Sequence, residues 1–345
     1  MTDAPRPPFP FVVGCNRSGT TLLRAMLDSH PDLGVPPEAY FTIGALRGAT
    51  GGASFDAAAL LHVIAADRSF ANWDLPTTAL DPLRADPPDG AADLVRGVYD
   101  AYASKNGKPR AGDKTPRNVL HVDLLASALP EARFVHLVRD GRDVVASVRE
   151  HLLGPESLPA AIDYWRDRVN AGRRAGATIG AERYLEIRYE DLVADPEPVL
   201  RDVCSFLDLA YTDAMLGYTA RADQVIAGVW DARNHEGVAR PPTAGVRDWR
   251  TTMSRPDVQL VDELAGDLLD ELGYGRSELP RSTTARARAL AWRRSAGLRR
   301  AVRPVTQPLA RRRRKRRRAQ DAGAPPRRNV TNPSGSEKSQ PRSSA

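Results

Sequence analysis

The chain has 345 residues, of which 41% are hydrophobic, so it can fill the core of one large domain or two ordinary ones. Its two cysteines, Cys15 and Cys204, exclude a disulfide framework and argue against a cysteine-rich metal site. No segment approaches about 18 uninterrupted apolar residues, and the first residues lack the pattern of a secretion signal. We therefore expect a cytoplasmic protein.

The net charge of +7 hides a division between two parts of the chain. Residues 281–345 contain 20 Lys and Arg against two acidic residues, a charge of +18, whereas residues 1–280 contain 30 against 41, a charge of −11. This division predicts a folded domain at 1–280 and a basic segment at 281–318. The remaining tail, 319–345, is too poor in apolar residues to fold, and we expect it to be disordered.

The first predicted unit is a strand, a loop and a helix. Phe9–Val13 is a short apolar run that ends at a glycine, and Leu or Met then recurs at the spacing of one helix face at positions 22, 23, 26 and 27. Between them, GCNRSGTT at 14–21 has the G-x-x-x-x-G spacing of a phosphate-binding loop. The lysine that nucleotide triphosphatases place after the second glycine is missing.

The segment 48–107 follows, and it has little strand signal and is rich in Ala, Asp and Pro. We interpret it as a helical insertion over the sheet edge that shapes an acceptor pocket.

Two further strand and helix units follow the insertion. Ala132–Val138 is a continuous apolar run followed by a helix that starts near Asp143, and Tyr184–Ile187 leads into a helix at 196–207. Such alternation predicts an α/β fold with a mainly parallel central sheet between layers of helices. The apolar spacing at 256–272 predicts a closing amphipathic helix.

The loop chemistry suits a phosphate group. A glycine turn between strand and helix directs backbone N–H groups to one point, and the helix N-terminus adds partial positive charge. Thr20 and Thr21 supply hydroxyl groups, and Arg17 supplies charge from inside the loop.

A second anion site is predicted near RDGRDVVAS. Arg139 follows a strand directly, and Ser147 lies eight residues later, one turn inside the expected helix. The alternative for this stretch is a surface salt-bridge cluster of alternating Arg and Asp. Lys114, in a polar turn, is a candidate for the charge that the loop lacks.

Four stretches, taken together and in order, resemble the sulfotransferase family that uses 3′-phosphoadenosine 5′-phosphosulfate (PAPS). They are RSGTTLLRAMLDSHPD, GDKTPRN, FVHLVRDGRDVVASV and RYEDLVADPEPVLRDVCSFL. The first is similar to the opening of tyrosylprotein sulfotransferases, and the resemblance covers about residues 9 to 275. It implies a P-loop-like, three-layer α/β domain, PAPS as co-substrate and no required metal.

The resemblance also implies roles for individual residues. The 5′-phosphosulfate would be held by the loop residues Arg17, Ser18, Gly19, Thr20 and Thr21. The 3′-phosphate would be held by Arg139 and Ser147, with Tyr189 near the nucleotide and Arg247 and Trp249 in a loop that closes over it.

For catalysis, the resemblance implies that Lys114 and Arg17 stabilise charge on the oxygen between sulfur and the leaving phosphate. Glu38 matches the second glutamate of the family's G-E-E-T stretch and is the implied general base. The sequence has Pro36-Pro37-Glu38-Ala39 here, so the first glutamate is absent, which argues against a peptide acceptor. His121 is the alternative base, because soluble small-molecule sulfotransferases use histidine.

The acceptor and partners stay open at this stage. A hydroxyl or amine of a glycan, glycolipid or small metabolite is expected. Residues 285–304 predict a basic, partly amphipathic helix suited to an anionic membrane, at the inner membrane face, or to non-specific nucleic-acid binding. The alternatives for the whole chain are a P-loop nucleotide kinase, which the missing lysine opposes, and a nucleic-acid-binding protein, which the acidic body opposes.

Overall fold

The computed structural model describes residues 6–50, 55–150, 154–155, 157–221 and 248–297, and only the backbone of 48–50, Glu150 and Arg221. All structural statements below concern these residues. Arg247 and the tail at 319–345 lie outside them.

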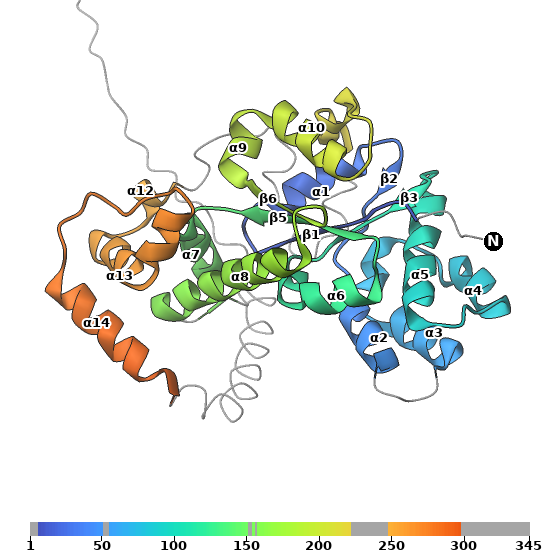
Figure 1. Cartoon of the computed structure of the whole chain (residues 1–345), viewed down its shortest axis with the longest axis horizontal. Helices are drawn as coiled ribbons and strands as arrows, with labels where there is room; N and C mark the ends of the chain where they lie inside the picture. The colour runs from blue at the N-terminus through green and yellow to red at the C-terminus, as the bar shows by residue number, and fades with distance from the viewer. Residues whose placement is uncertain (1–5, 51–54, 151–153, 156, 222–247, 298–345) are drawn as a thin grey trace, which may run out of the picture. The chain divides into compact units, whose positions relative to one another are not determined.

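The centre of the fold is a parallel sheet with the strand order β4-β1-β5-β6 (Figure 1). Its strands are β1 (Phe9–Gly14), β4 (Asp113–Lys114), β5 (Ala132–Val138) and β6 (Tyr184–Arg188). A second parallel pair joins β2 (Leu33–Gly34) to β3 (Arg110–Ala111). The predicted parallel sheet is confirmed, with β5 at the predicted bounds.

Both faces of the sheet are buried, which explains the continuous apolar runs. Phe11 and Phe134 belong to one hydrophobic cluster, whereas their neighbours Val12 and Val135 belong to another. Successive side chains of a strand point to opposite faces, so each strand contributes to two cores. The result is the predicted three-layer α/β fold.

Helices cover the two faces of the sheet (Figure 1). One layer contains α1 (Thr20–Asp28), α9 (Tyr189–Ala194) and α10 (Pro196–Phe206). The opposite layer contains α6 (Val122–Ala128) and α8 (Leu158–Ile179). The sequence did not mark α8, although its Ala161, Ile162, Trp165 and Val169 are buried at helical spacing.

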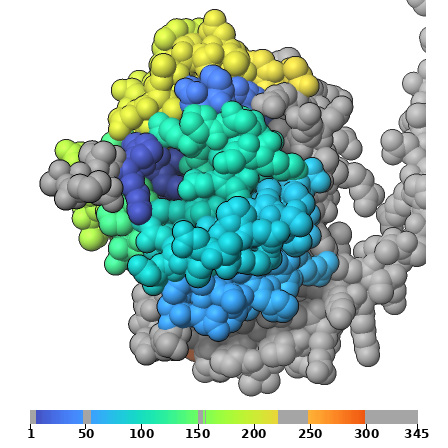
Figure 2. Space-filling view, turned by 90° about the vertical axis from the view of Figure 1, so that its right-hand side faces the viewer, coloured from blue at the N-terminus to red at the C-terminus, as the bar shows by residue number. Residues whose placement is uncertain are grey.

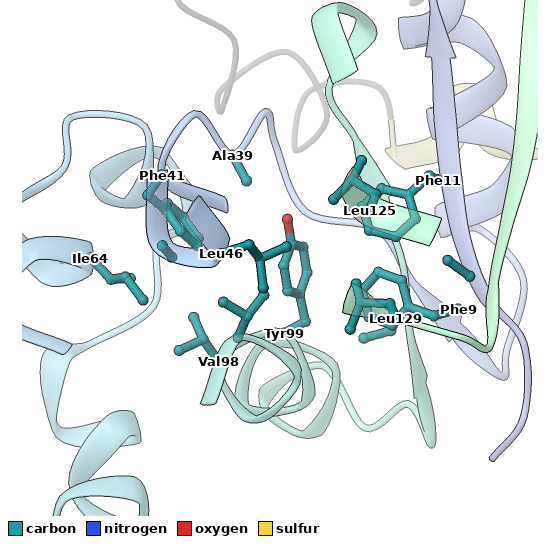
Figure 3. Packing of buried hydrophobic residues seen from close by; sticks show 14 of the residues in the cluster. Phe9, Phe11, Ala39, Phe41, Leu46, Ile64, Val98, Tyr99, Leu125 and Leu129 are labelled. Atoms are coloured by element: carbon teal, nitrogen blue, oxygen red, sulfur yellow. The ribbon is translucent and has the colours of Figure 1, made fainter. Parts of the chain in front are cut away.

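The segment between β2 and β3 is helical. It contains α2 (Phe41–Thr50), α3 (Ala57–Ala66), α4 (Asp81–Ala85) and α5 (Ala91–Lys105). Figure 2 shows these helices, in light blue to teal, covering much of one side of the molecule. Aromatic rings fill the space beneath them, with Tyr99 between Phe41 on one side and Phe9 on the other (Figure 3).

Helices α7 (Gly141–Glu150), α13 (Arg255–Glu271) and α14 (Thr283–Arg294) share a third hydrophobic cluster with α8. The short helix α12 (Trp249–Thr252) precedes α13, and Met253 after it packs against the same cluster. Helix α7 starts two residues earlier than predicted, because Asp140 accepts the backbone N–H of Arg142 and stabilises an earlier first turn.

Helix α14 packs on the domain with part of its surface. Ala285 and Ala289 are buried, and Trp292 Nε1 donates to Asp163 Oδ2 at 2.8 Å, whereas Leu290 is 48% exposed. No helix among the described residues is both long and apolar enough to cross a membrane.

Candidate active site

The candidate site residues gather where the parallel strands end. The loop of residues 15–19 follows β1, Lys114 ends β4, Arg139 follows β5 and Tyr189 follows β6. The register places Gly14 beside Leu137 and Val138 beside Arg188, so these ends lie at one edge of the sheet. The carboxyl edge of a parallel sheet is where α/β proteins bind their ligands.

The loop has the backbone of an anion site. Arg17 and Gly19 have positive φ angles of 76° and 93°, so the chain folds back before Thr20 begins α1. The first turn of α1 has no side-chain cap and no acidic residue, so the positive end of the helix dipole suits an anion.

Ser18 supplies a direct test of whether a ligand fits this loop. The residue is 1% exposed, and its Oγ has no hydrogen-bond partner among the described residues. A buried hydroxyl without a partner is costly. A phosphate or sulfate oxygen in the loop would satisfy it, so the residues fit such a group.

Tyr189 closes one side of the loop. A Cβ atom on Gly19 would lie only 2.3 Å from Tyr189 Cδ2, which explains why glycine is required there beyond its φ angle. The Arg139 guanidinium carbon lies 4.4 Å from the Tyr189 ring centroid, within the range of a cation–π contact.

The two predicted anion sites are joined through arginine side chains. Arg17 Nε donates to Ser147 Oγ at 3.0 Å. Arg139 Nη1 donates to the carbonyl oxygen of Arg17 at 3.4 Å. The structure therefore brings Arg17, Arg139 and Ser147 together, from three separate segments.

The ion pairs of the salt-bridge alternative exist, but the arginines are not at the surface. Arg139 pairs with Asp143 at 3.2 Å, and Arg142 pairs with Asp140 at 2.8 Å. The two arginines are 8% and 2% exposed. Such buried pairs fix the start of α7, and they leave Arg139 beside the loop.

Trp249 is held at the start of α7. Its backbone N–H donates to Asp143 Oδ1 at 2.8 Å, and the Arg142 guanidinium carbon lies 4.1 Å from its ring centroid. The buried indole Nε1 has no acceptor in the described part of the chain. Arg139 also donates to Asp143, so this carboxylate links Trp249 to Arg139.

Lys114 and Glu38 form an ion pair, with Nζ and Oε1 3.0 Å apart. The expectation of a polar turn was wrong for Lys114, which lies on β4 and is 1% exposed. A two-residue polar strand leaves no hydrophobic pattern from which to predict it. The Tyr40 hydroxyl donates to the other oxygen of Glu38.

Burial acts on the charge of Lys114. Desolvation lowers the pKa of its ammonium group, and the carboxylate of Glu38 opposes this effect. Pairing with Glu38 therefore favours the charged form of Lys114 in its buried position. Arg24, on α1, is also buried.

His121 has a different neighbour from Glu38. It ends a short 3₁₀ helix (Pro116–His121), and its Nδ1 lies 3.2 Å from Arg47 Nη2. Burial, together with the cations Arg47 and Arg117, lowers the pKa of the imidazole. These contacts favour a neutral ring.

Three residues of the site were not singled out from the sequence. Tyr164, on α8, donates to Asn16 Oδ1 of the loop at 2.9 Å, and burial raises the pKa of its hydroxyl to about 12. Asp113 is fully buried beside Lys114, and Tyr40 contacts Glu38. Asp113 and Tyr40 adjoin predicted site residues, whereas Tyr164 lies 148 positions from Asn16 and gave no signal.

The chain matches known proteins over this same region. A model of the sulfotransferase family matches residues 8–213. The nodulation protein NoeE of Sinorhizobium fredii (strain NBRC 101917 / NGR234) is 25% identical over 79% of this chain and 68% of its own length. The protein-tyrosine sulfotransferase of Drosophila melanogaster is 27% identical over 61% of this chain, but the match spans only 40% of that relative.

A solved structure shares the fold. The sulfotransferase domain of the Synechococcus PCC 7002 olefin synthase has a TM-score of 0.56 and 26% identity, covering 81% of this chain and 98% of that domain. The family model covers more than half of the chain, including β1, the loop, Lys114, Arg139 and Tyr189. The chain belongs to the sulfotransferase family.

Proposed function

We propose that the chain transfers the sulfuryl group of PAPS to an acceptor hydroxyl, or amine. The observation that carries the proposal is the contact of Arg17 with Ser147, because it joins a loop suited to one anion to a second site beside Arg139. A nucleotide with a phosphosulfate at one end of its ribose and a phosphate at the other needs two such sites. ATP needs one extended triphosphate site, with the charge of the missing lysine.

The loop would hold the 5′ end of the donor. Its backbone N–H groups, the hydroxyl of Ser18 and the side chains of Thr20 and Thr21 supply neutral donors, and Arg17 supplies charge. Arg139 and Ser147 would hold the 3′-phosphate, with Tyr189 beside the nucleotide. Trp249, whose buried indole N–H has no partner among the described residues, would contact the same ligand. We extend the proposal to Arg247, which lies outside the described residues.

When bound, PAPS supplies a sulfur atom that is attacked by the acceptor oxygen while its bond to the 5′-phosphate oxygen breaks. Transfer of this kind passes through a loose in-line transition state, so positioning and charge stabilisation matter most. Lys114 donates one of its three N–H groups to Glu38. The others are suited to the leaving oxygen, and we propose no metal in this role.

Glu38 is the proposed general base. Its Oε1 accepts from Lys114 and its Oε2 from Tyr40, so the carboxylate is held in one orientation next to the cation that serves the leaving oxygen. It would take the proton of the acceptor hydroxyl. His121 is the second candidate.

The acceptor would approach Glu38 beside the exposed ring of Tyr40, which the Arg117 guanidinium carbon approaches to 5.7 Å. We propose a glycan, glycolipid or small metabolite as its class. The relatives range from a nodulation protein to protein-tyrosine sulfotransferases, so they do not select one acceptor. A cytoplasmic location, with peripheral contact to the inner membrane through residues 281–318, is part of the same proposal.

The test is a transfer assay with PAPS carrying a radiolabelled sulfuryl group. The panel of acceptors contains 4-nitrophenol, octyl glucoside, a membrane lipid extract and a tyrosine peptide, with labelled ATP-Mg²⁺ in parallel. We expect labelled product from PAPS alone, and none from Arg17→Ala. Phosphate transfer from ATP instead would favour a kinase, and salt-dependent DNA retention without any transfer would favour a nucleic-acid-binding protein.

A further inference from the structure

Asp113 is a fully buried carboxylate next to the Lys114–Glu38 pair. It lies on β4 and is 0% exposed. It accepts hydrogen bonds from Tyr99 Oη at 2.8 Å, Thr115 Oγ1 at 2.9 Å and Asn118 Nδ2 at 3.0 Å. Such a group is costly to bury, and three donors are needed to offset the loss of water.

The contacts of Asp113 continue to the segment that carries Glu38. Thr115 Oγ1 donates its proton to Asp113 and accepts the backbone N–H of Ala39 at 2.8 Å. Because the Tyr99 proton is used on Asp113, Thr42 Oγ1 donates to Tyr99 Oη at 2.8 Å. Figure 3 shows the Tyr99 hydroxyl at the end of the ring that faces Ala39.

A second hydroxyl holds the next backbone amide. The N–H of Tyr40 donates to Ser69 Oγ at 3.0 Å, and Ser69 itself donates to Asp67. The two amides that follow Glu38 are thus bound by side-chain hydroxyls from two different segments. Backbone fixed in this way leaves the Glu38 side chain little freedom to turn from Lys114.

We propose that Asp113 and Thr115 are positioning residues that hold Glu38 opposite Lys114 through the amide of Ala39. The inference rests on the proposed function for its catalytic consequence, although not for the geometry. Asp113 and Lys114 are successive residues of one strand, so the same strand that supplies the cation also fixes the base. If Asp113 and Thr115 only filled space in the core, neither the charge of the first nor the hydroxyl of the second would be needed.

The expected effect of losing this link is large for transfer and small for donor binding. A displacement of about 1 Å in a reacting group lowers the rate by about 100-fold. The donor site is built from the loop, α7 and Tyr189, none of which hydrogen-bonds to Thr115 in the described part of the chain.

The test compares Thr115→Val, which keeps the shape and removes the hydroxyl, with Thr115→Ser, which keeps the hydroxyl. Thr178→Val is the matched control, because among the described residues the Thr178 hydroxyl bonds within α8, to the carbonyl oxygen of Arg174. Four quantities are measured. They are kcat and KM for PAPS with the best acceptor of the panel, the Kd of adenosine 3′,5′-bisphosphate, and the Glu38–Lys114 separation in crystals.

We expect Thr115→Val to lower kcat by about 10- to 100-fold. The KM for PAPS and the Kd of the bisphosphate should stay within threefold of the wild-type values. In the crystal structure of this variant, Glu38 should lie beyond ion-pair distance of Lys114. Thr115→Ser restores kcat, and Thr178→Val matches the wild type. If Thr115→Val does not fold, Asp113→Asn is expected to give the same separation of kcat from Kd.

An unchanged Glu38–Lys114 separation in Thr115→Val overturns the inference. So does a loss of bisphosphate binding that parallels the loss of kcat. If the wild type transfers no sulfuryl group at all, the proposed function fails, and the crystal structures still decide whether Thr115 positions Glu38.

Discussion

Arg17 Nε lies 3.0 Å from Ser147 Oγ, although the two residues are 130 positions apart. The contact joins the loop after β1 to the second half of α7, the helix that follows β5. It requires an unusual backbone, because Arg17 has a φ of 76°. A residue with a side chain is strained in this region, and such strain is found where a side chain serves a ligand.

The strain at Arg17 predicts that two variants with an equal loss of activity differ in stability. Arg17→Gly and Arg17→Ala both remove the guanidinium group, and each should lower transfer by about 10²- to 10³-fold. Because glycine adopts positive φ freely, Arg17→Gly should be more stable than Arg17→Ala by about 1 kcal/mol. Urea unfolding of the two variants measures the difference, and equal midpoints would show that the loop is unstrained.

The assignment of the base predicts a clear difference between two variants. Glu38→Gln should lower kcat by about 10²- to 10⁴-fold, the usual contribution of a general base. His121→Ala should stay within threefold of the wild type, since His121 contacts Arg47 rather than Lys114. Steady-state kinetics with the panel acceptor decide between them, and a large loss in His121→Ala alone would transfer the role to histidine.

The buried carboxyl group of Asp113 predicts a pH dependence of stability. Burial raises its pKa from 3.8 to about 6, against the effect of its three hydrogen bonds. The folded state therefore binds more protons than the unfolded state between these two values, and the stability from this group falls as the pH rises through that window.

The measurement is the free energy of unfolding of the wild type relative to Asp113→Asn. A shift of about two pKa units corresponds to about 3 kcal/mol, so the difference should decline by that amount between about pH 4 and pH 7. Urea titrations across this range measure it. A difference that rises with pH would place the pKa of Asp113 below its ordinary value.

The basic segment predicts membrane binding that depends on residues after α14. Trp292 is bonded to Asp163 and Ala289 is buried, so a chain ending at Pro280 would lose part of the folded domain. A chain ending at Gly297 keeps α14 and removes the run of arginines at 311–318. We expect the full chain to float with anionic vesicles, because each basic residue near an anionic surface contributes roughly 1 kcal/mol of binding free energy.

The shorter chain should stay in the soluble fraction. Equal recovery of the two chains with vesicles would remove the membrane proposal. Recovery of the full chain with zwitterionic vesicles alone would also contradict its electrostatic basis.

The elements that could be predicted are those with a local pattern. Strands β1 and β5 carry continuous apolar runs because both faces of the sheet are buried, and the loop at 14–19 has a fixed spacing between its glycines. Arg139 could be placed because it follows a strand directly, at the edge where ligands bind.

The residues that could not be predicted depend on contacts between distant segments. Strand β4 has two polar residues and no pattern of its own, so neither the burial of Lys114 nor its pairing with Glu38, 76 positions away, was visible. The link from Asp113 through Thr115 to Ala39 spans the same separation. Tyr164 reaches Asn16 from a helix that the sequence did not mark.

The central claim is that the loop without a lysine, together with Arg139, is built for a nucleotide with separate 3′ and 5′ anions. The most direct measurement is thermal unfolding with adenosine 3′,5′-bisphosphate or ATP-Mg²⁺, for the wild type and Arg139→Ala. We predict a clear rise in Tm with the bisphosphate that Arg139→Ala largely removes, since a ligand that binds only the folded state stabilises it. A greater rise with ATP-Mg²⁺, or a bisphosphate effect unchanged in Arg139→Ala, would contradict the account.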